Sequence, residues 1–202
     1  MRLFHSATSP FVRKVMVVLH ETGQLDRVEL VPAAGSPVAP GTMPVAVNPL
    51  GKVPTLERPD GPALYDSRVI TRYLDALGEG GLYPESPRLW ETLTLEATGE
   101  GITEAALLMV YEARLREAQA QNGDWIEGQW SKAARALDVL EARWLAHLAG
   151  RIDAGQIAVG CALGYLDFRH GARDWRAGRP GLARWFERFG ARPAMVATRP
   201  VE

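Results

Sequence analysis

Apolar and polar positions follow two different patterns along this chain, and the change falls near residue 80. Before that point, short apolar runs typical of strands are interleaved with helical periodicity; after it, only long helical patterns remain. The first part predicts a small mixed sheet with helices on it, and the second predicts a bundle of helices. We therefore expect an α/β domain over residues 1–78, a Gly- and Pro-rich linker over 79–85, and an all-α domain over 86–202.

The first part predicts the order strand, helix, strand, loop, strand, strand, helix. A helix should begin at Pro10, because the missing N–H of proline costs nothing at a first helical position, and should end near Gly23. Asp66 or Ser67 is expected to cap the second helix. The expected strands are residues 2–5, 27–32, 53–58 and 63–65, with an irregular segment over 33–47.

Four long helical patterns fill the second part of the chain. The first is expected to bend near Gly99 and Gly101, since glycine weakens a helix interior. The third is mostly apolar on every side, which predicts a buried central helix. The patterns cover residues 89–119, 124–150, 156–172 and 179–195.

Composition excludes several classes of function. The 202 residues are 47% hydrophobic, ample for a packed core, and the formal net charge of -1 gives no basic footprint for nucleic acid. The apolar runs are too short to span a bilayer, and Cys161 as the single cysteine rules out an internal disulfide. The four histidines show no metal-ligand spacing. We expect a cytoplasmic protein with no metal, no nucleic-acid partner and no membrane contact.

Three hydroxyl side chains, Ser6, Thr8 and Ser9, stand where the first strand gives way to the first helix. Any of them could cap that helix, and one could instead face a substrate. No histidine in the sequence is an evident partner for a nucleophilic serine here. The residues alone leave both interpretations open.

Three segments, in order and at matching spacing, resemble the glutathione transferase superfamily. They are "TSPFVRKV" from Thr8, "NPLGKVPTLE" over residues 48–57 and "LYDSRVITRYL" over residues 64–74. The first is most similar to bacterial members with a Ser-Pro-Phe motif, a motif also found in tau-type plant enzymes. The resemblance implies a thioredoxin-like domain followed by a helical domain, a homodimer, and glutathione as co-substrate in detoxification.

The resemblance also implies how the first motif acts. Ser9 occupies the position of the catalytic hydroxyl, which would donate its O–H to the glutathione thiolate, with Thr8 as the rival donor. Phe11 would line the start of the electrophile pocket or belong to the core. Of the next two residues, Arg13 and Lys14, one is expected to face solvent and neither is assigned to the site.

Five further residues are implied to bind glutathione. Val53-Pro54 matches the family's cis-proline pair, whose main chain would pair with the cysteinyl unit, although a plain turn also fits. Asp66-Ser67 matches the acidic-Ser pair that would receive the γ-glutamyl end, and simple capping of a helix can coexist with that role. Lys52 would approach the glycyl carboxylate or remain solvated.

The resemblance also concerns residues in the helical half of the chain, at the second-substrate pocket and at the cap of the buried helix. Glu104 and Tyr111 are the candidates for the second-substrate pocket. A family capping box for the buried helix is missing at Gln156, and Asp153 is the alternative cap one turn earlier.

The function expected from the sequence is a glutathione S-transferase that adds the glutathione thiolate to a small electrophile. Two alternatives remain open at this stage. One is a protein-interaction module of the same fold without activity, and the other is a glutathione-dependent peroxidase or isomerase.

Overall fold

The computed structural model describes residues 1–201 and divides into two compact units. The first unit contains residues 1–85 together with 194–201, and the second is Ser86–Pro193. The segment from residue 194 onward, which the sequence analysis placed in the helical domain, therefore packs with the first unit. Each unit is described on its own below.

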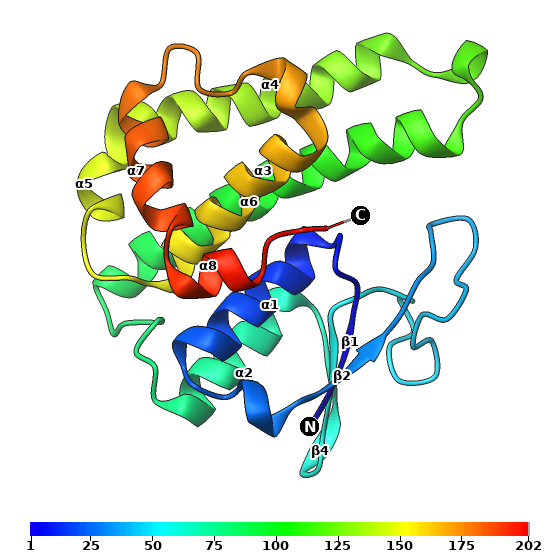
Figure 1. The fold of residues 1–202 in the computed structure, drawn as a ribbon, viewed down its shortest axis with the longest axis vertical. Helices are drawn as coiled ribbons and strands as arrows, with labels where there is room; N and C mark the ends of the chain where they lie inside the picture. The colour runs from blue at the N-terminus through cyan, green and yellow to red at the C-terminus, as the bar shows by residue number, and fades with distance from the viewer. Residues whose placement is uncertain (202) are drawn as a thin grey trace. The chain divides into compact units, whose positions relative to one another are not determined.

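A four-stranded mixed sheet forms the base of the first unit, as the short apolar runs of the sequence predicted. Its strand order is β2-β1-β3-β4; β1 runs parallel to β2 and antiparallel to β3, and β3 pairs antiparallel with β4 (Figure 1). The strands are β1 (Arg2–His5), β2 (Glu29–Pro32), β3 (Thr55–Arg58) and β4 (Gly61–Leu64). The parallel pair requires a crossover, which the first helix supplies.

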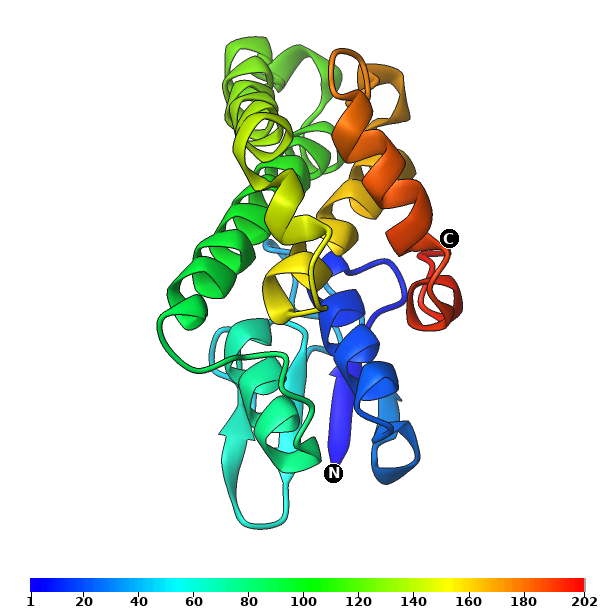
Figure 2. The same ribbon diagram turned by 90° about the vertical axis from the view of Figure 1, so that its left-hand side faces the viewer.

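Helices α1 (Pro10–Glu21) and α2 (Ser67–Gly78) cover one face of this sheet (Figures 1 and 2). Helix α1 begins at Pro10 as predicted, and Gly23 with φ of +63° closes the turn that follows it. The core between the two layers consists of side chains with no measurable exposure. They include Leu3 and Leu56 from the strands and Val15, Val18, Leu19, Ile70 and Leu74 from the helices.

The long connection after β2 contains no helix. Residues 33–47 form turns with one isolated bridge between Ser36 and Ala39, in agreement with the predicted irregular segment. This segment lies on the side of the sheet opposite α1 and α2 (Figure 1). A single 3-10 turn, η1 (Leu25–Arg27), precedes β2.

The second unit is entirely helical, as predicted. Helix α6 is its centre: every residue from Ala154 to Leu166 is buried, which confirms the interpretation of the apolar pattern. Helices α3 and α4 pack side by side, and α6 packs along α3 (Figure 1). The elements are α3 (Arg88–Leu115), η2 (Ala118–Ala120), α4 (Gly123–Val139), η3 (Leu140–Trp144), α5 (Leu145–Leu148), α6 (Ala154–His170), η4 (Gly171–Arg173) and α7 (Pro180–Gly190). The short helix α8 (Pro193–Ala197) follows them, and from residue 194 it belongs to the first unit.

Helix α3 continues without interruption through both of its glycines. A Cβ atom added to Gly99 would lie 2.6 Å from the main-chain carbon of Ala158, whereas one added to Gly101 would meet nothing within 4 Å. Gly99 therefore serves close packing of α3 against α6, a role that its sequence pattern did not predict.

Helix α6 is capped by Asp153, which confirms the alternative cap proposed from the sequence. Its Oδ1 accepts the Gln156 N–H at 3.0 Å, and its Oδ2 accepts the Thr92 hydroxyl at 3.0 Å and lies 2.7 Å from His147 Nε2. The Gln156 side chain does not return to the cap but donates to carbonyls of the preceding turn, such as that of His147 at 3.0 Å. Asp153 thus joins α3, α5 and α6.

None of the helices in residues 1–201 is both long enough and apolar enough to cross a membrane.

Candidate functional site

The sheet register brings the three motifs to one end of the first unit. Phe4, near the end of β1, pairs with Thr55, the first residue of β3. Leu64, the last residue of β4, pairs with Leu56 of the same strand β3. The segment after β1, the segment before β3 and the segment after β4 therefore all emerge at the same end of the sheet.

Ser9 caps helix α1 at this end. Its Oγ accepts the Val12 N–H at 3.3 Å, and its own N–H donates to the Ser6 carbonyl at 3.1 Å. Within residues 1–201 no group accepts the Ser9 hydroxyl proton. Because a hydroxyl carries one proton and two lone pairs, Ser9 can cap the helix and donate to a ligand at the same time.

The rival hydroxyls are engaged with each other. Thr8 Oγ1 lies 3.2 Å from Ser6 Oγ, within hydrogen-bonding distance. The two interpretations of Ser9 raised by the sequence, cap and donor, are thus compatible. Phe11, two residues further along α1, is half-buried.

The peptide bond between Val53 and Pro54 is cis, as the resemblance implied. Strand pairing of β3 starts only at Thr55, and no hydrogen bond among the described residues uses the amide or carbonyl of Val53. Backbone groups of this kind are normally paired when buried, and Val53 is half-buried. Its main chain therefore offers one donor and one acceptor to an extended ligand.

Asn48 fixes the loop that carries this edge. The side chain is 1% exposed, and its Nδ2 donates to the Lys52 carbonyl at 3.1 Å and to Thr55 Oγ1 at 2.9 Å. Its Oδ1 accepts the Leu50 N–H at 3.0 Å, and Thr55 Oγ1 donates to the same Lys52 carbonyl at 2.8 Å. The carbonyl immediately before Val53 is thereby held from two sides. Sequence reasoning missed this residue, although an Asn that opens a turn is a known pattern.

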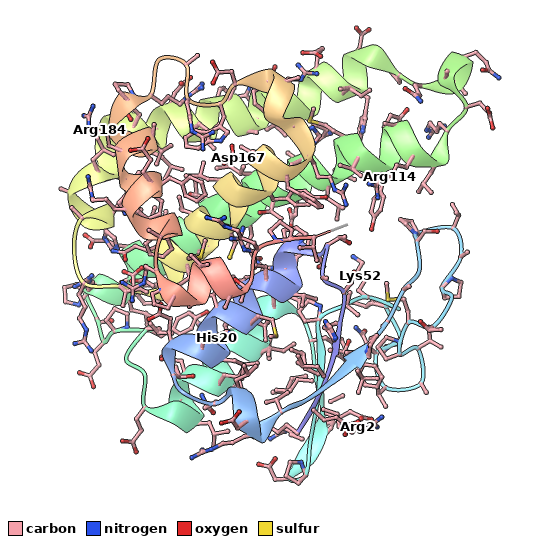
Figure 3. The ribbon with its side chains drawn as sticks, in the orientation of Figure 1. Arg2, His20, Lys52, Arg114, Asp167 and Arg184 are labelled. Carbon is pink, nitrogen blue, oxygen red and sulfur yellow. The ribbon has the colours of Figure 1, made fainter. Side chains whose placement is uncertain are left out.

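Lys52 itself leaves its side chain exposed at the surface of the loop (Figure 3). Its main chain is fixed by Asn48 and Thr55, whereas its ammonium group forms no hydrogen bond or ion pair within residues 1–201. The position leaves the charge accessible to an anionic ligand.

Asp66 caps helix α2, and Ser67 is the buried first residue of that helix. Asp66 Oδ1 accepts the Arg68 N–H at 3.0 Å, and Oδ2 pairs with the Arg68 guanidinium at 3.0 Å. Partial burial acts to raise the pKa of Asp66, but the hydrogen bonds and charge of Arg68, aided by Lys14, outweigh it and hold the pKa below its usual value. The carboxylate is therefore ionised near neutral pH.

The peptide bond between Tyr65 and Asp66 is also cis.

Arg13 and Lys14 are both buried, at 7% and 3% exposure, so the expectation that one of them faces solvent is wrong. Arg13 Nη2 donates to the Met195 carbonyl at 3.1 Å, which ties α1 to α8. The sequence predicted a helix here but could not show that the distant Met195 carbonyl would meet the Arg13 side chain.

The two candidates for the second-substrate pocket lie in the helical unit, on the same side of α3. Glu104 is exposed and Tyr111, two turns later, is half-buried. Burial raises the pKa of the Tyr111 phenol, and the charge of Arg114 opposes that rise.

Replacing Asn48 by Ala should lower the free energy of unfolding by about 2 kcal/mol, because the change leaves buried polar groups of the loop without partners. Urea denaturation would measure the loss. Asn122→Ala is the matched control: its Oδ1 accepts the Trp125 N–H at 3.0 Å at an exposed helix cap, where about 1 kcal/mol is expected. Equal losses in the two variants would contradict the role given to Asn48.

Comparison with known proteins bears on this arrangement. Residues 8–77 match the family described as glutathione S-transferase, N-terminal domain, and residues 123–188 match glutathione S-transferase, C-terminal domain. The chain belongs to the glutathione S-transferase family. The fold of this family, a small α/β domain with a four-stranded sheet followed by helices, is the fold described above.

Relatives of this glutathione S-transferase family member cover its whole length. A glutathione transferase family member from Pseudomonas fluorescens Pf-5, solved with bound glutathione, is 49% identical with a TM-score of 0.96, covering 100% of this chain and 99% of its own. A second structure from that organism, 48% identical with a TM-score of 0.92 and complete coverage of both chains, contains S-(propanoic acid)-glutathione. The "Uncharacterized GST-like protein YibF" of Escherichia coli K12 is 34% identical, covering 99% of this chain and 98% of YibF.

Proposed function

We propose that this protein binds glutathione in its first unit and activates the thiol for attack on a small electrophile. The observation that carries the proposal is the convergence, at one end of the sheet, of a hydroxyl proton without an acceptor at Ser9 and an unpaired main-chain edge at Val53. The glutathione bound in the Pseudomonas fluorescens relative supports the assignment of that ligand.

Each part of glutathione has a matching group in the first unit. The cysteinyl unit pairs with the amide and carbonyl of Val53, ahead of Pro54, in the manner of a short added strand. The γ-glutamyl carboxylate takes the start of α2 at Ser67, and its ammonium takes the ionised Asp66. The exposed Lys52 receives the glycyl carboxylate, a solvated contact that contributes little.

Ser9 stabilises the thiolate. A thiol with a pKa of about 8.5 is about 3% ionised at pH 7, and lowering that pKa by about 2 units needs about 2.7 kcal/mol. A hydrogen bond to a charged group supplies about 1.5–3 kcal/mol, and the start of α1 adds about 0.3–1 kcal/mol. One hydroxyl and one helix terminus are therefore sufficient.

The finer assignments belong to the same proposal. Phe11 borders the electrophile, and Glu104 and Tyr111 line the second-substrate site. The motif from Ser9 to Phe11 relates the chain to the tau-like group of transferases. We further propose a cytoplasmic homodimer with a role in detoxification, acting without a metal ion.

A thiolate held in this way could also serve a peroxidase or an isomerase. Conjugation is favoured because the second relative contains S-(propanoic acid)-glutathione, a thioether of the kind that conjugation forms. An inactive interaction module is disfavoured, because the chain keeps both the hydroxyl at Ser9 and the acidic-Ser pair.

Isothermal titration with glutathione tests the proposal. The wild-type protein should bind, and Asp66→Asn should weaken binding about tenfold, because it removes the charge facing the ammonium group while the amide oxygen can still cap α2. Asp60→Asn, at an exposed turn residue 3.5 Å from Arg58, is the control and should bind as the wild type does. A folded wild-type protein that releases no binding heat and shows no thermal stabilisation by glutathione would refute the function.

A further inference from the structure

An open cavity of about 680 Å³ lies within the helical unit. Its walls come from the first turn of α3, from the end of α4 with η3, and from α5 with the turn after it, elements that can be followed in Figure 2. All of these residues fall between Ser86 and Pro193, so the cavity belongs to one unit. Its volume is in the range of small-molecule sites in proteins.

Two side chains of the cavity are held in place by the buried Asp153. His147 Nε2 lies 2.7 Å from Asp153 Oδ2, and Arg88 Nη2 lies 3.6 Å from the same oxygen. The same Arg88 nitrogen donates to the Arg151 carbonyl at 2.9 Å. Because Asp153 is 1% exposed and caps α6, its carboxylate is a fixed support. The guanidinium group of Arg88 and the ring of His147 are therefore preorganised at the cavity wall.

Arg143 brings a positive charge to the cavity. It is exposed in the π-helical turn and has no hydrogen-bond or ion-pair partner in the part of the chain that the structure describes. The acid in the lining is Glu91, whose side chain is 63% exposed and whose Oε2 lies 3.7 Å from His147 Nδ1, beyond hydrogen-bonding distance. An exposed carboxylate is well screened by solvent, so Glu91 opposes a bound anion only weakly.

Aromatic and apolar surface accompanies these charges. Trp144 is half-buried, and its ring meets that of His147 edge to face, with the centroids 5.7 Å apart. Val139, which is 39% exposed, and Ala146 belong to the same lining. An indole ring gains from contact with another flat ring. The cavity thus combines donors for an anion with surface for an aromatic group.

We propose that this cavity binds a small organic phosphate monoester, whose phosphate contacts Arg88, Arg143 and His147 and whose ring contacts Trp144. The site goes beyond the proposed function and does not rest on it, because the residues proposed to bind glutathione all precede residue 68 and belong to the first unit.

The arrangement of donors favours a phosphate over a carboxylate. A planar carboxylate is satisfied by one guanidinium group, whereas a phosphate has three terminal oxygens that can take donors from several directions. Arg88 and Arg143 come from different helical elements, and Arg88 contacts protein groups only through Nη2, which leaves its other N–H groups for a ligand. Since His147 Nε2 faces Asp153, Nδ1 is the ring atom that can share a proton with a phosphate oxygen.

Isothermal titration with phenyl phosphate tests the site. The wild-type protein should bind it about tenfold more tightly than benzoate, which replaces the phosphate by a carboxylate, and about fivefold more tightly than inorganic phosphate, which lacks the ring. Arg143→Leu should weaken the binding of phenyl phosphate about tenfold, because it removes a charge-assisted contact. Arg184→Leu, at an exposed arginine of α7 (Figure 3), removes the same charge elsewhere and should bind as the wild type does.

Glu91→Gln should change the affinity in the opposite direction. The amide keeps the size of the side chain and removes the opposing charge, so phenyl phosphate should bind about threefold more tightly. A gain of affinity cannot come from damage to the fold, which separates the proposed site from a merely structural role of these side chains. Unchanged or weaker binding in Glu91→Gln would contradict the placement of the anion.

Nuclear magnetic resonance of the histidine rings locates the bound ligand. The ring signals of His147 should move as phenyl phosphate is added, whereas those of His20, on α1 in the first unit (Figure 3), should not. Movement at His20 with none at His147 would overturn the site, as would the absence of saturable binding up to about 10 mM or equal affinities of Arg143→Leu and Arg184→Leu. Benzoate that binds as tightly as phenyl phosphate would overturn the ligand class.

Glutathione titration keeps this proposal separate from the proposed function. Arg143→Leu should bind glutathione as the wild type does, because Arg143 lies in the helical unit and the proposed glutathione residues lie in the first. Loss of phosphate binding with normal glutathione binding therefore concerns only the cavity.

Discussion

Replacing Ser9 by Ala should raise the pKa of the bound glutathione thiol by about 1.2–1.8 units and lower kcat/KM at pH 7 about 5–15-fold, because the start of α1 still supplies about 0.3–1 kcal/mol. Alanine removes the only proton at this position that is available to a thiolate, and the helix terminus alone supplies too little stabilisation. The loss should shrink as pH rises, because above about pH 9.5 the thiol is ionised in both proteins. Ultraviolet absorbance of the bound thiolate against pH measures the shift directly.

Two further variants separate this effect from loss of the helix cap. Ser9→Thr keeps a hydroxyl and a cap and should restore most of the activity. Ser9→Gly has no side-chain donor, starts a helix nearly as well as Ser, and should behave like Ser9→Ala. Thr8→Ala should leave the thiol titration unchanged, since the Thr8 hydroxyl faces Ser6. The assignment is wrong if the Ser9→Ala titration overlays that of the wild type, or if Thr8→Ala reproduces the shift.

Replacing Asp153 by Ala should cost about 3 kcal/mol of folding stability. Asp153 is 1% exposed, and its removal leaves the Gln156 N–H, the Thr92 hydroxyl and His147 Nε2 without an acceptor in a buried region. For a chain of this size the loss corresponds to about 6–12 °C in the thermal midpoint. Differential scanning calorimetry would measure it.

Asp124 provides a matched control in the same unit. It is an exposed acid in the first turn of α4, and Asp124→Ala should change stability by less than about 0.5 kcal/mol. Asp153→Asn should fall between the two, because the amide oxygen can still accept the Gln156 N–H. A melting temperature of Asp153→Ala within about 1 °C of the wild type would show that the network is not needed.

The sequence predicted well those elements whose start or burial is determined by residues within the element itself. Pro10 marked the start of α1, the polar pair Asp66-Ser67 marked the start of α2, and the apolar run of α6 marked a buried helix. In each of these cases a local preference agrees with the tertiary structure, so the pattern was sufficient. The cis bond before Pro54 came from the resemblance to a family rather than from periodicity.

The features that the sequence did not reveal depend on distant contacts. Arg13 is charged, yet it is buried because the Met195 carbonyl, far along the chain, meets its guanidinium. Asn48 looks like an ordinary turn residue, and only the fold shows that it holds the carbonyl before Val53. The predicted helix over 124–150 contains the π-helical turn Leu140–Trp144, whose extra residue per turn leaves no mark in a 3.6-residue pattern.

The placement of α8 with the first unit has a consequence for synthesis. Met195 has no measurable exposure, and its carbonyl is a partner of Arg13 in α1, so this packing cannot form until Met195, 182 residues after Arg13, has been synthesised. On the ribosome the helical unit can reach its own core earlier, because its residues are continuous from Ser86 to Pro193. Helix α1 thus acquires part of its packing only after the whole helical unit has been synthesised.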